Sequence, residues 1–191
     1  MEYWAKRMTD YILKQKVIEE EDYAIYKYGL QTGMEMSLCV IITAVIAIIM
    51  DSFLEYIVLM IMFFPLRAYV GGIHLKAFHS CFVCSCVVLT LGLWFAKKST
   101  LDGWVMILPI WILMFVNHRL AYLTTAKKTD EEDIKFYASQ RRKIMMILCI
   151  CLLIFQIVGL DRWIALMLYM LVVIFGSVVL EIVLNTKNKI S

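Results

Sequence analysis

Side chains that can do chemistry crowd into one short polar stretch between two apolar runs. Residues 67–81 read "RAYVGGIHLKAFHSC" and hold an Arg, a Lys, a Cys and two of the chain's three His. Ser80 is a good N-cap residue, which predicts that Cys81 lies in the first turn of a helix, where the helix dipole favours a thiolate. A nearby His can take the thiol proton and later protonate a leaving amine. The stretch indicates the nucleophile and base of a cysteine peptidase or acyltransferase.

The identity of the base is left open by the residues alone. His74 lies seven residues before Cys81, which in one straight helix is about 10.5 Å of rise, too far for a direct hydrogen bond. The pair requires a bend, and Pro65 and Gly71–Gly72 permit one. His79 is closer in sequence but points to nearly the opposite helix face. His118 lies in a distant apolar run and approaches only through the fold, so His74 is modestly favoured.

A metal site is the competing interpretation of the same stretch. Five side chains are close enough in sequence to supply four ligands, namely His74, His79, Cys81, Cys84 and Cys86. Cys84 and Cys86 are embedded in an apolar run, which is a poor setting for structural zinc. We therefore expect no metal. The remaining cysteines, Cys39, Cys149 and Cys151, also lie in apolar runs and are interpreted as small hydrophobic residues, not as a disulfide framework.

The composition is that of an integral membrane protein. Of the 191 residues, 62% are hydrophobic, and the mean hydropathy is +0.78, whereas a soluble domain is about 45–50% apolar. No basic stripe is interleaved with aromatics, so the expected partner is the lipid bilayer and not nucleic acid. We predict an all-α fold of about six apolar helical segments, and leave open whether one or two of them are re-entrant instead of spanning, the third and shortest being the first candidate. The predicted apolar helical segments are 32–50, 53–69, 81–96, 104–125, 144–160 and 163–184.

The charged segments define the predicted organisation. Residues 1–28 are expected to form an amphipathic cytoplasmic or interfacial helix. Residues 29–191 form a single polytopic membrane domain with a catalytic break at 65–81 and a basic cytoplasmic loop at 126–143. If all six segments cross, the side that carries the N-terminus holds all but three of the 19 Lys and Arg residues, and basic residues favour the cytoplasm. Both termini and the break are therefore predicted to be cytoplasmic. The three exceptions are Lys97, Lys98 and Arg162.

The spacing within the break resembles that of a known family. Arg67, Gly72, His74 and Cys81 reproduce the Arg-(x4)-Gly-x-His-(x6)-Cys pattern of the accessory gene regulator B (AgrB) peptidases. The "YGLQ" at 28–31 resembles a second family signature, and the basic residues of the predicted loop fall where the family has a basic cytoplasmic loop. One departure is that "TTAKKTDEED" lacks the Pro and Asn that family members often carry there.

The resemblance implies a membrane-embedded cysteine endopeptidase of the bacterial cell membrane. It would cleave a quorum-sensing propeptide of the AgrD type and cyclise the released portion to a thiolactone or lactone through an acyl-enzyme. Cys81 would be the nucleophile and His74 the base, with no cofactor, in a homodimer. The alternative function is that of a non-catalytic small membrane transporter or binding protein.

Several residues are assigned supporting roles. Arg67 is expected to brace the break or bind a substrate carboxylate, and Gly72 to serve its backbone geometry. Gln31 is a candidate oxyanion donor. Glu35 is costly in lipid and is expected to face a polar cavity or to snorkel. Four basic residues would attract an acidic substrate tail: Lys127, Lys128, Arg141 and Arg142.

Overall fold

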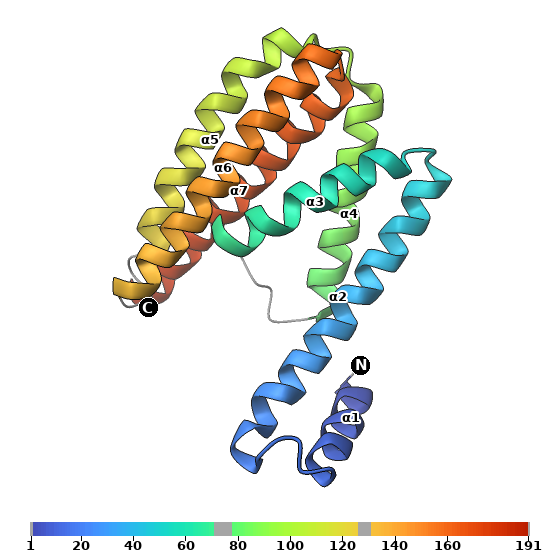
Figure 1. Cartoon of the computed structure of the whole chain (residues 1–191), viewed down its shortest axis with the longest axis vertical. Helices are drawn as coiled ribbons and strands as arrows, with labels where there is room; N and C mark the ends of the chain where they lie inside the picture. Colours follow the sequence, from blue (N-terminus) through green and yellow to red (C-terminus); the bar gives the residue numbers. More distant parts are fainter. Residues whose placement is uncertain (1, 71–77, 126–130, 191) are drawn as a thin grey trace.

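The computed structural model describes residues 2–70, 78–125 and 131–190, and within them it is helical (Figure 1). Each of the six predicted apolar segments falls in a different long helix, with 32–50 and 144–160 extending one and two residues past the helix end, so the all-α prediction is confirmed. A short 3-10 helix, η1 (Glu20–Asp22), lies directly before the helix that contains the first apolar segment. The α-helices are α1 (Glu2–Lys14), α2 (Tyr23–Ile49), α3 (Phe53–Val70), α4 (Phe78–Lys98), α5 (Gly103–Thr125), α6 (Glu131–Val158) and α7 (Asp161–Ile190).

The long helices alternate in direction along the chain. The tight turns after α2 and α6 contain Asp51 at φ 53° and Gly159 at φ 75°, and they lie at one end of the molecule together with the connection from α4 to α5 (Figure 1). Both termini lie towards the other end, as do the C-terminal end of α3 and the N-terminal end of α4. Lys97 and Lys98 end α4 and Arg162 lies in the first turn of α7, so all three belong to the helix ends that lie away from the termini.

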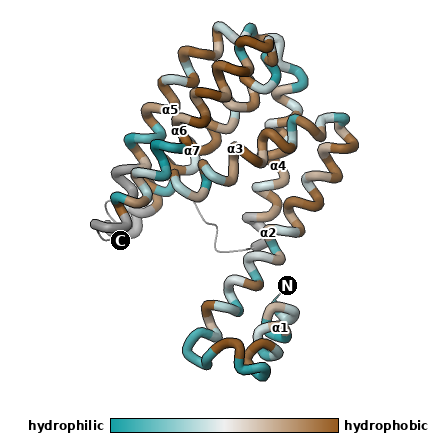
Figure 2. Tube along the Cα trace, in the orientation of Figure 1, coloured by the Kyte–Doolittle hydropathy of each residue, from teal (hydrophilic) through white to brown (hydrophobic). Residues whose placement is uncertain are grey.

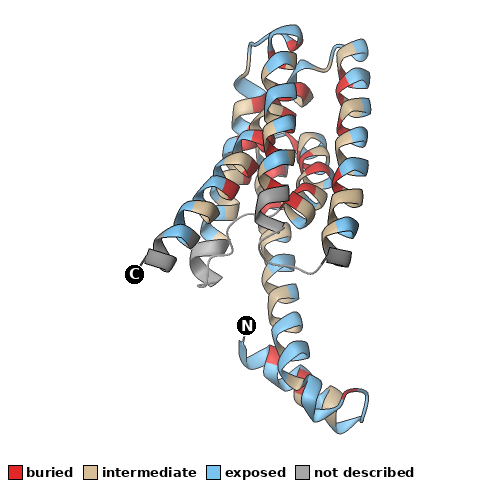
Figure 3. Cartoon of the chain, turned by 90° about the vertical axis from the view of Figure 1, so that its left-hand side faces the viewer, coloured by how far each residue is buried: buried red, intermediate tan, exposed pale blue. Residues whose placement is uncertain are grey.

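Helix α7 is the centre of the bundle. It packs against α3, α4, α5 and α6, and buried residues recur along it from Ile164 to Val178. Figure 3 shows buried residues gathered inside the bundle, whereas the N-terminal part of α2 projects from it and has no buried residue before Thr43. The shared core on α7 comprises Ile164, Ala165, Leu166, Met167, Met170, Leu171, Ile174 and Val178.

Four segments have the length and composition of a membrane span: Glu20–Ile49, Phe53–Val70, Gly103–Ala121 and Asp161–Leu184. The described residues of α4 and α6 are outside this group, but α4 packs against α7, and α6 packs against α3, α5 and α7. Large apolar side chains such as Ile48, Val105 and Leu153 are exposed, and Figure 2 shows that hydrophobic residues make up much of the long helices. Lipid is the solvent that such a surface requires, so the chain is a membrane protein.

The polar break is shorter than the predicted 65–81 at both ends. Pro65 lies inside α3, which continues to Val70, and Ser80 lies inside α4 instead of capping it. Pro65, which the sequence predicts to permit a bend, therefore does not end α3. Proline removes one backbone hydrogen bond, and a helix packed among neighbours can continue past it.

The N-terminal segment is a helical hairpin and not one helix over 1–28. After α1, Lys16 adopts φ 54°, and the chain turns back through η1 into α2. Lys27 Nζ donates to Glu2 Oε1 at 2.9 Å, and Tyr23 Oη donates to Asp10 Oδ1 at 2.7 Å. The hydrogen bond and charge of Lys27 lower the pKa of the exposed Glu2 carboxyl. Together these contacts hold α1 against the start of α2.

A first testable consequence concerns the close approach of α4 and α7 at Gly92. A Cβ there would lie 2.8 Å from Cε1 of Tyr169, so Gly92→Ala should destabilise the protein by about 1–2 kcal/mol and lower the apparent unfolding midpoint in detergent by about 2–6 °C. Gly176→Ala is the matched control, because nothing lies within 4 Å of its added Cβ and alanine is the better helix former. Equal midpoints for the two variants would contradict the close packing of Tyr169 over Gly92.

Candidate functional site

The structure describes part of the predicted site. The backbone of Cys81 lies in the first turn of the described α4, as expected. Gly72, His74, Lys127 and Lys128 lie outside the described residues. Within the part of the chain whose side chains are described, no three His, Cys, Asp or Glu residues gather as metal ligands. Four cysteines of the described part of the chain are free thiols, namely Cys84, Cys86, Cys149 and Cys151.

Arg67 lies in the last turn of α3, immediately before the undescribed segment. It is partly buried, and its Nη1 donates to Ser177 Oγ on α7 at 3.5 Å. Two residues later, the ring of Tyr69 lies 6.1 Å from the ring of Tyr137 on α6. The end of α3 is thus held against two other helices, an arrangement that favours the bracing role for Arg67.

Arg141 and Arg142 are neighbours in sequence with opposite environments. Both belong to α6, which begins at Glu131, so most of the predicted cytoplasmic segment 126–143 is helical. Arg141 is 0% exposed, and its Nη1 donates to the carbonyl oxygen of Ala121 on α5 at 3.1 Å. Arg142 is exposed. The burial of Arg141 favours a structural role between α5 and α6, whereas Arg142 is available at the surface for an acidic ligand.

Gln31 and Glu35 face each other on α2. Gln31 Nε2 donates to Glu35 Oε1 at 3.0 Å, and both side chains are partly buried. The pair is separated by one helical turn, the spacing at which side chains on a helix meet. The carboxylate therefore has a polar partner along its own helix.

Polar side chains that the sequence analysis did not assign also join the helices. Asn117 on α5 is 0% exposed and donates through Nδ2 to the Leu171 carbonyl oxygen on α7 at 3.1 Å. Tyr169 Oη on α7 donates to the Val88 carbonyl oxygen on α4 at 2.8 Å. The signal for Asn117 was its position within the apolar run "ILMFVNHRLAYL", because a buried amide in a membrane helix requires a partner. No comparable signal marks Ser177 or Tyr169.

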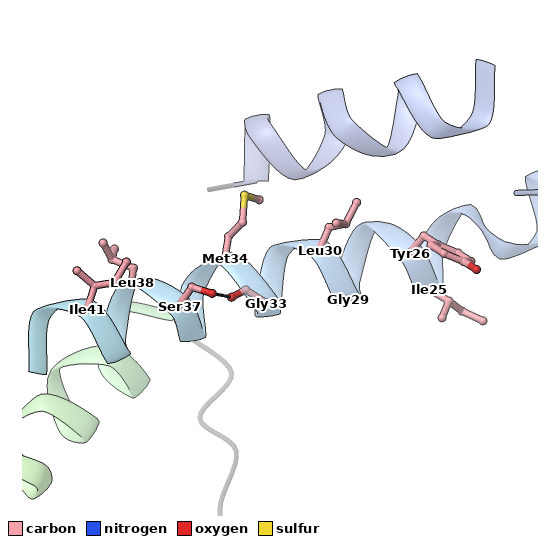
Figure 4. A pocket seen from close by; sticks show the side chains of 9 residues that line it. All are labelled: Ile25, Tyr26, Gly29, Leu30, Gly33, Met34, Ser37, Leu38 and Ile41. Atoms are coloured by element: carbon pink, nitrogen blue, oxygen red, sulfur yellow. Dashed lines mark hydrogen bonds between the residues drawn. The ribbon is translucent and has the colours of Figure 1, made fainter. Parts of the chain in front are cut away.

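An open apolar groove of ≈ 760 Å³ runs along α2 (Figure 4). Small residues recur at every fourth position along it, at Gly29, Gly33 and Ser37, and their lack of side-chain bulk leaves the hollow. Ser37 Oγ is turned to its own helix and donates to the Gly33 carbonyl oxygen at 2.8 Å. Neither Gln31 nor Glu35 lines this groove, so it is separate from the predicted site residues.

The fold and the placement of the site residues define the class of the protein. It is an all-α membrane protein in which the Arg, Gly, His and Cys pattern runs in sequence from the end of α3 to the start of α4, two helix ends that lie towards the same end of the molecule as the termini (Figure 1). A family model described as accessory gene regulator B matches residues 5–184.

The chain therefore belongs to the accessory gene regulator B family. Membership implies a part in agr quorum sensing, in processing of the autoinducer precursor, and an AgrD-type propeptide as partner. A search of curated proteins and a search of solved structures each returned no match.

Proposed function

We propose that the protein is a cysteine endopeptidase that cleaves an AgrD-type propeptide and cyclises the released portion. The observation that carries the proposal is the Arg67–Gly72–His74–Cys81 pattern within a chain that matches the AgrB family over nearly its whole length. Cys81 is the nucleophile and His74 the general base and acid. The backbone position of Cys81 in the first turn of α4 supports this role, because that position favours a thiolate.

The first step forms an acyl-enzyme. His74 takes the proton of the Cys81 thiol, and the thiolate attacks the carbonyl carbon at the C-terminal side of the future ring. The peptide C–N bond breaks, and His74 passes the proton to the leaving amine. The C-terminal tail of the propeptide departs with a new amino terminus.

The second step closes the ring. A Cys thiol or Ser hydroxyl within the bound peptide loses its proton to His74 and attacks the Cys81 thioester. The acyl group moves to the peptide's own side chain, and the proton returns to the Cys81 sulfur. No water is consumed and no cofactor is needed, because one acyl bond replaces another. A site shielded by the bundle would limit hydrolysis of the thioester.

The surrounding residues have proposed supporting roles. Arg142, Lys127 and Lys128 attract the acidic propeptide tail, with Arg141 holding α6 in place. We further propose that the site and both termini face the cytoplasm of a bacterial cell and that the protein works as a homodimer. The placement of Lys97, Lys98 and Arg162 away from the termini supports this orientation.

Co-expression with an AgrD-type propeptide tests the two steps separately. The expected products are a free C-terminal tail and a cyclic peptide whose mass is that of the residual segment minus water. If the internal Cys or Ser of the propeptide is replaced by Ala, cleavage should continue as far as a thioester on Cys81 or a linear product, without cyclisation. Release of cyclic peptide from the Ala-substituted propeptide would contradict this ring chemistry. Absence of any processing by the unmodified pair would contradict the endopeptidase.

Replacement of each His by Ala identifies the base. We expect His74→Ala to lower the rate of propeptide cleavage by at least about 100-fold, the usual size of a general acid–base contribution. His79→Ala and His118→Ala should retain cleavage within a few fold. Quantification of the released tail by mass spectrometry gives the three rates. A larger loss at His79 or His118 than at His74 would assign the base elsewhere.

A further inference from the structure

The two helices that flank the reactive segment are joined through a third helix. α3 ends at Val70 and α4 begins at Phe78. Among the described residues, α3 and α4 have at most marginal contact with each other, whereas both pack against α7. The distance and angle between the two helix ends therefore depend on how each of them is fixed to α7.

Ser177 fixes the end of α3. Its Oγ accepts a hydrogen bond from Arg67 Nη1 at 3.5 Å and donates to the carbonyl oxygen of Ile174 on its own helix at 2.9 Å. The second bond orients the hydroxyl, so its lone pairs are available to Arg67. The first bond is long and weak in itself, but it acts on the last turn before the reactive segment.

Tyr169 fixes α4 more tightly. Its hydroxyl donates to the Val88 carbonyl oxygen at 2.8 Å, and its ring covers Gly92. The ring of Phe95, also on α4, has its centroid 5.9 Å from that of the Tyr169 ring. Val88 is seven residues from Cys81, which is about 10.5 Å along the helix. A slide or rotation of α4 against Tyr169 is therefore transmitted to the position of Cys81.

We propose that Tyr169 and Ser177 are positioning residues that set the approach of His74 to Cys81 by fixing α4 and α3 to α7. The proposal rests on the proposed function. Neither side chain is assigned a contact with substrate. Their effect is on geometry, and misplacement of reacting groups by about 1 Å can cost a reaction about 100-fold in rate.

The test uses Tyr169→Phe, Ser177→Ala and the double variant of the full chain, reconstituted in lipid nanodiscs with an AgrD-type propeptide. We expect kcat to fall about 10-fold in Tyr169→Phe and about 100-fold in the double variant, with KM changed less than twofold. Ser177→Thr retains the hydroxyl and should restore kcat to within threefold of the unsubstituted protein.

Two matched controls separate positioning from general loss of stability. Tyr56→Phe removes a hydroxyl that lies 3.0 Å from Thr43 Oγ1 and donates to the Val40 carbonyl oxygen, joining α2 to α3 at the opposite end. Thr186→Ala removes a hydroxyl on α7 that donates to the Ile182 carbonyl oxygen of its own helix. Both controls should keep kcat within threefold. A loss in Tyr56→Phe equal to that in Tyr169→Phe would overturn the proposal.

The alkylation rate of individual cysteines against pH gives an independent readout. In the unsubstituted protein, pairing with His74 should make Cys81 react at lower pH than Cys84, which is exposed on the same helix. In the double variant the Cys81 profile should move towards that of Cys84, whose own profile stays fixed. If the variants are active and their kcat values and Cys81 profiles equal those of the unsubstituted protein, only the positioning proposal is overturned. Absence of processing and of a distinct Cys81 profile in the unsubstituted protein would instead overturn the proposed function.

Discussion

Cys81→Ala is expected to abolish propeptide processing. The variant lacks the nucleophile, so no thioester forms, and both the tail and the cyclic peptide should fall by at least about 10³-fold, as when the nucleophile of a covalent catalyst is removed. Membrane insertion and the unfolding midpoint should stay close to those of the unsubstituted protein. The measurement is mass spectrometry of the released tail after co-expression.

Cys84→Ala is the matched control, since Cys84 lies one turn further along the same helix and is exposed. It should retain processing within about twofold. Cys81→Ser gives a third comparison, because a hydroxyl is far less acidic than a thiol; it should bind the propeptide but cleave it poorly. Equal activity of Cys81→Ala and Cys84→Ala would exclude Cys81 as the nucleophile.

Arg141→Ala should destabilise the bundle, whereas Arg142→Ala should not. Arg141 is 0% exposed and donates to the Ala121 carbonyl oxygen at 3.1 Å, and a hydrogen bond from a charged donor is worth about 1.5–3 kcal/mol. With the cavity left by the lost side chain, we expect the apparent unfolding midpoint in detergent to fall by about 5–10 °C. Differential scanning fluorimetry would measure it.

Replacement of Arg142 should affect binding of the propeptide and not the stability of the bundle. Because it is exposed, Arg142→Ala should leave the midpoint within about 2 °C, consistent with the small effect of most surface substitutions. It should instead raise KM for a propeptide with an acidic tail, and the increase should shrink as salt screens the attraction. Equal thermal shifts in the two variants would contradict the different environments of the two arginines.

The helices were predictable because a lipid-facing helix must be apolar over most of its length. Each of the six long helices contains most of one apolar run, and the direction of each follows from simple alternation. Helix ends were predicted less well. Pro65 and Ser80 are residues that commonly end or begin helices, but both lie inside helices here. Lys16, at φ 54°, gave no sequence signal for the turn that divides the N-terminal segment.

The site was predictable only where it depends on spacing along the chain. The Arg67–Gly72–His74–Cys81 pattern is local and could be recognised in the sequence. Contacts between distant helices could not, because nothing near Ser177 or Tyr169 indicates which helix lies opposite. Arg141 and Arg142 illustrate the same limit: two adjacent basic residues look alike in sequence, and only the packing of α5 against α6 distinguishes them.

The length of α2 has a consequence for Glu35. The helix has 27 residues, or about 40 Å, against a hydrocarbon thickness of about 30 Å. A helix longer than the hydrocarbon layer must tilt or leave roughly its first two turns outside the lipid. Helical side chains lean towards the N-terminus, so the Glu35 carboxylate reaches towards the nearer boundary, where Gln31 receives it. The acidic group is thereby directed out of the hydrocarbon along its own helix.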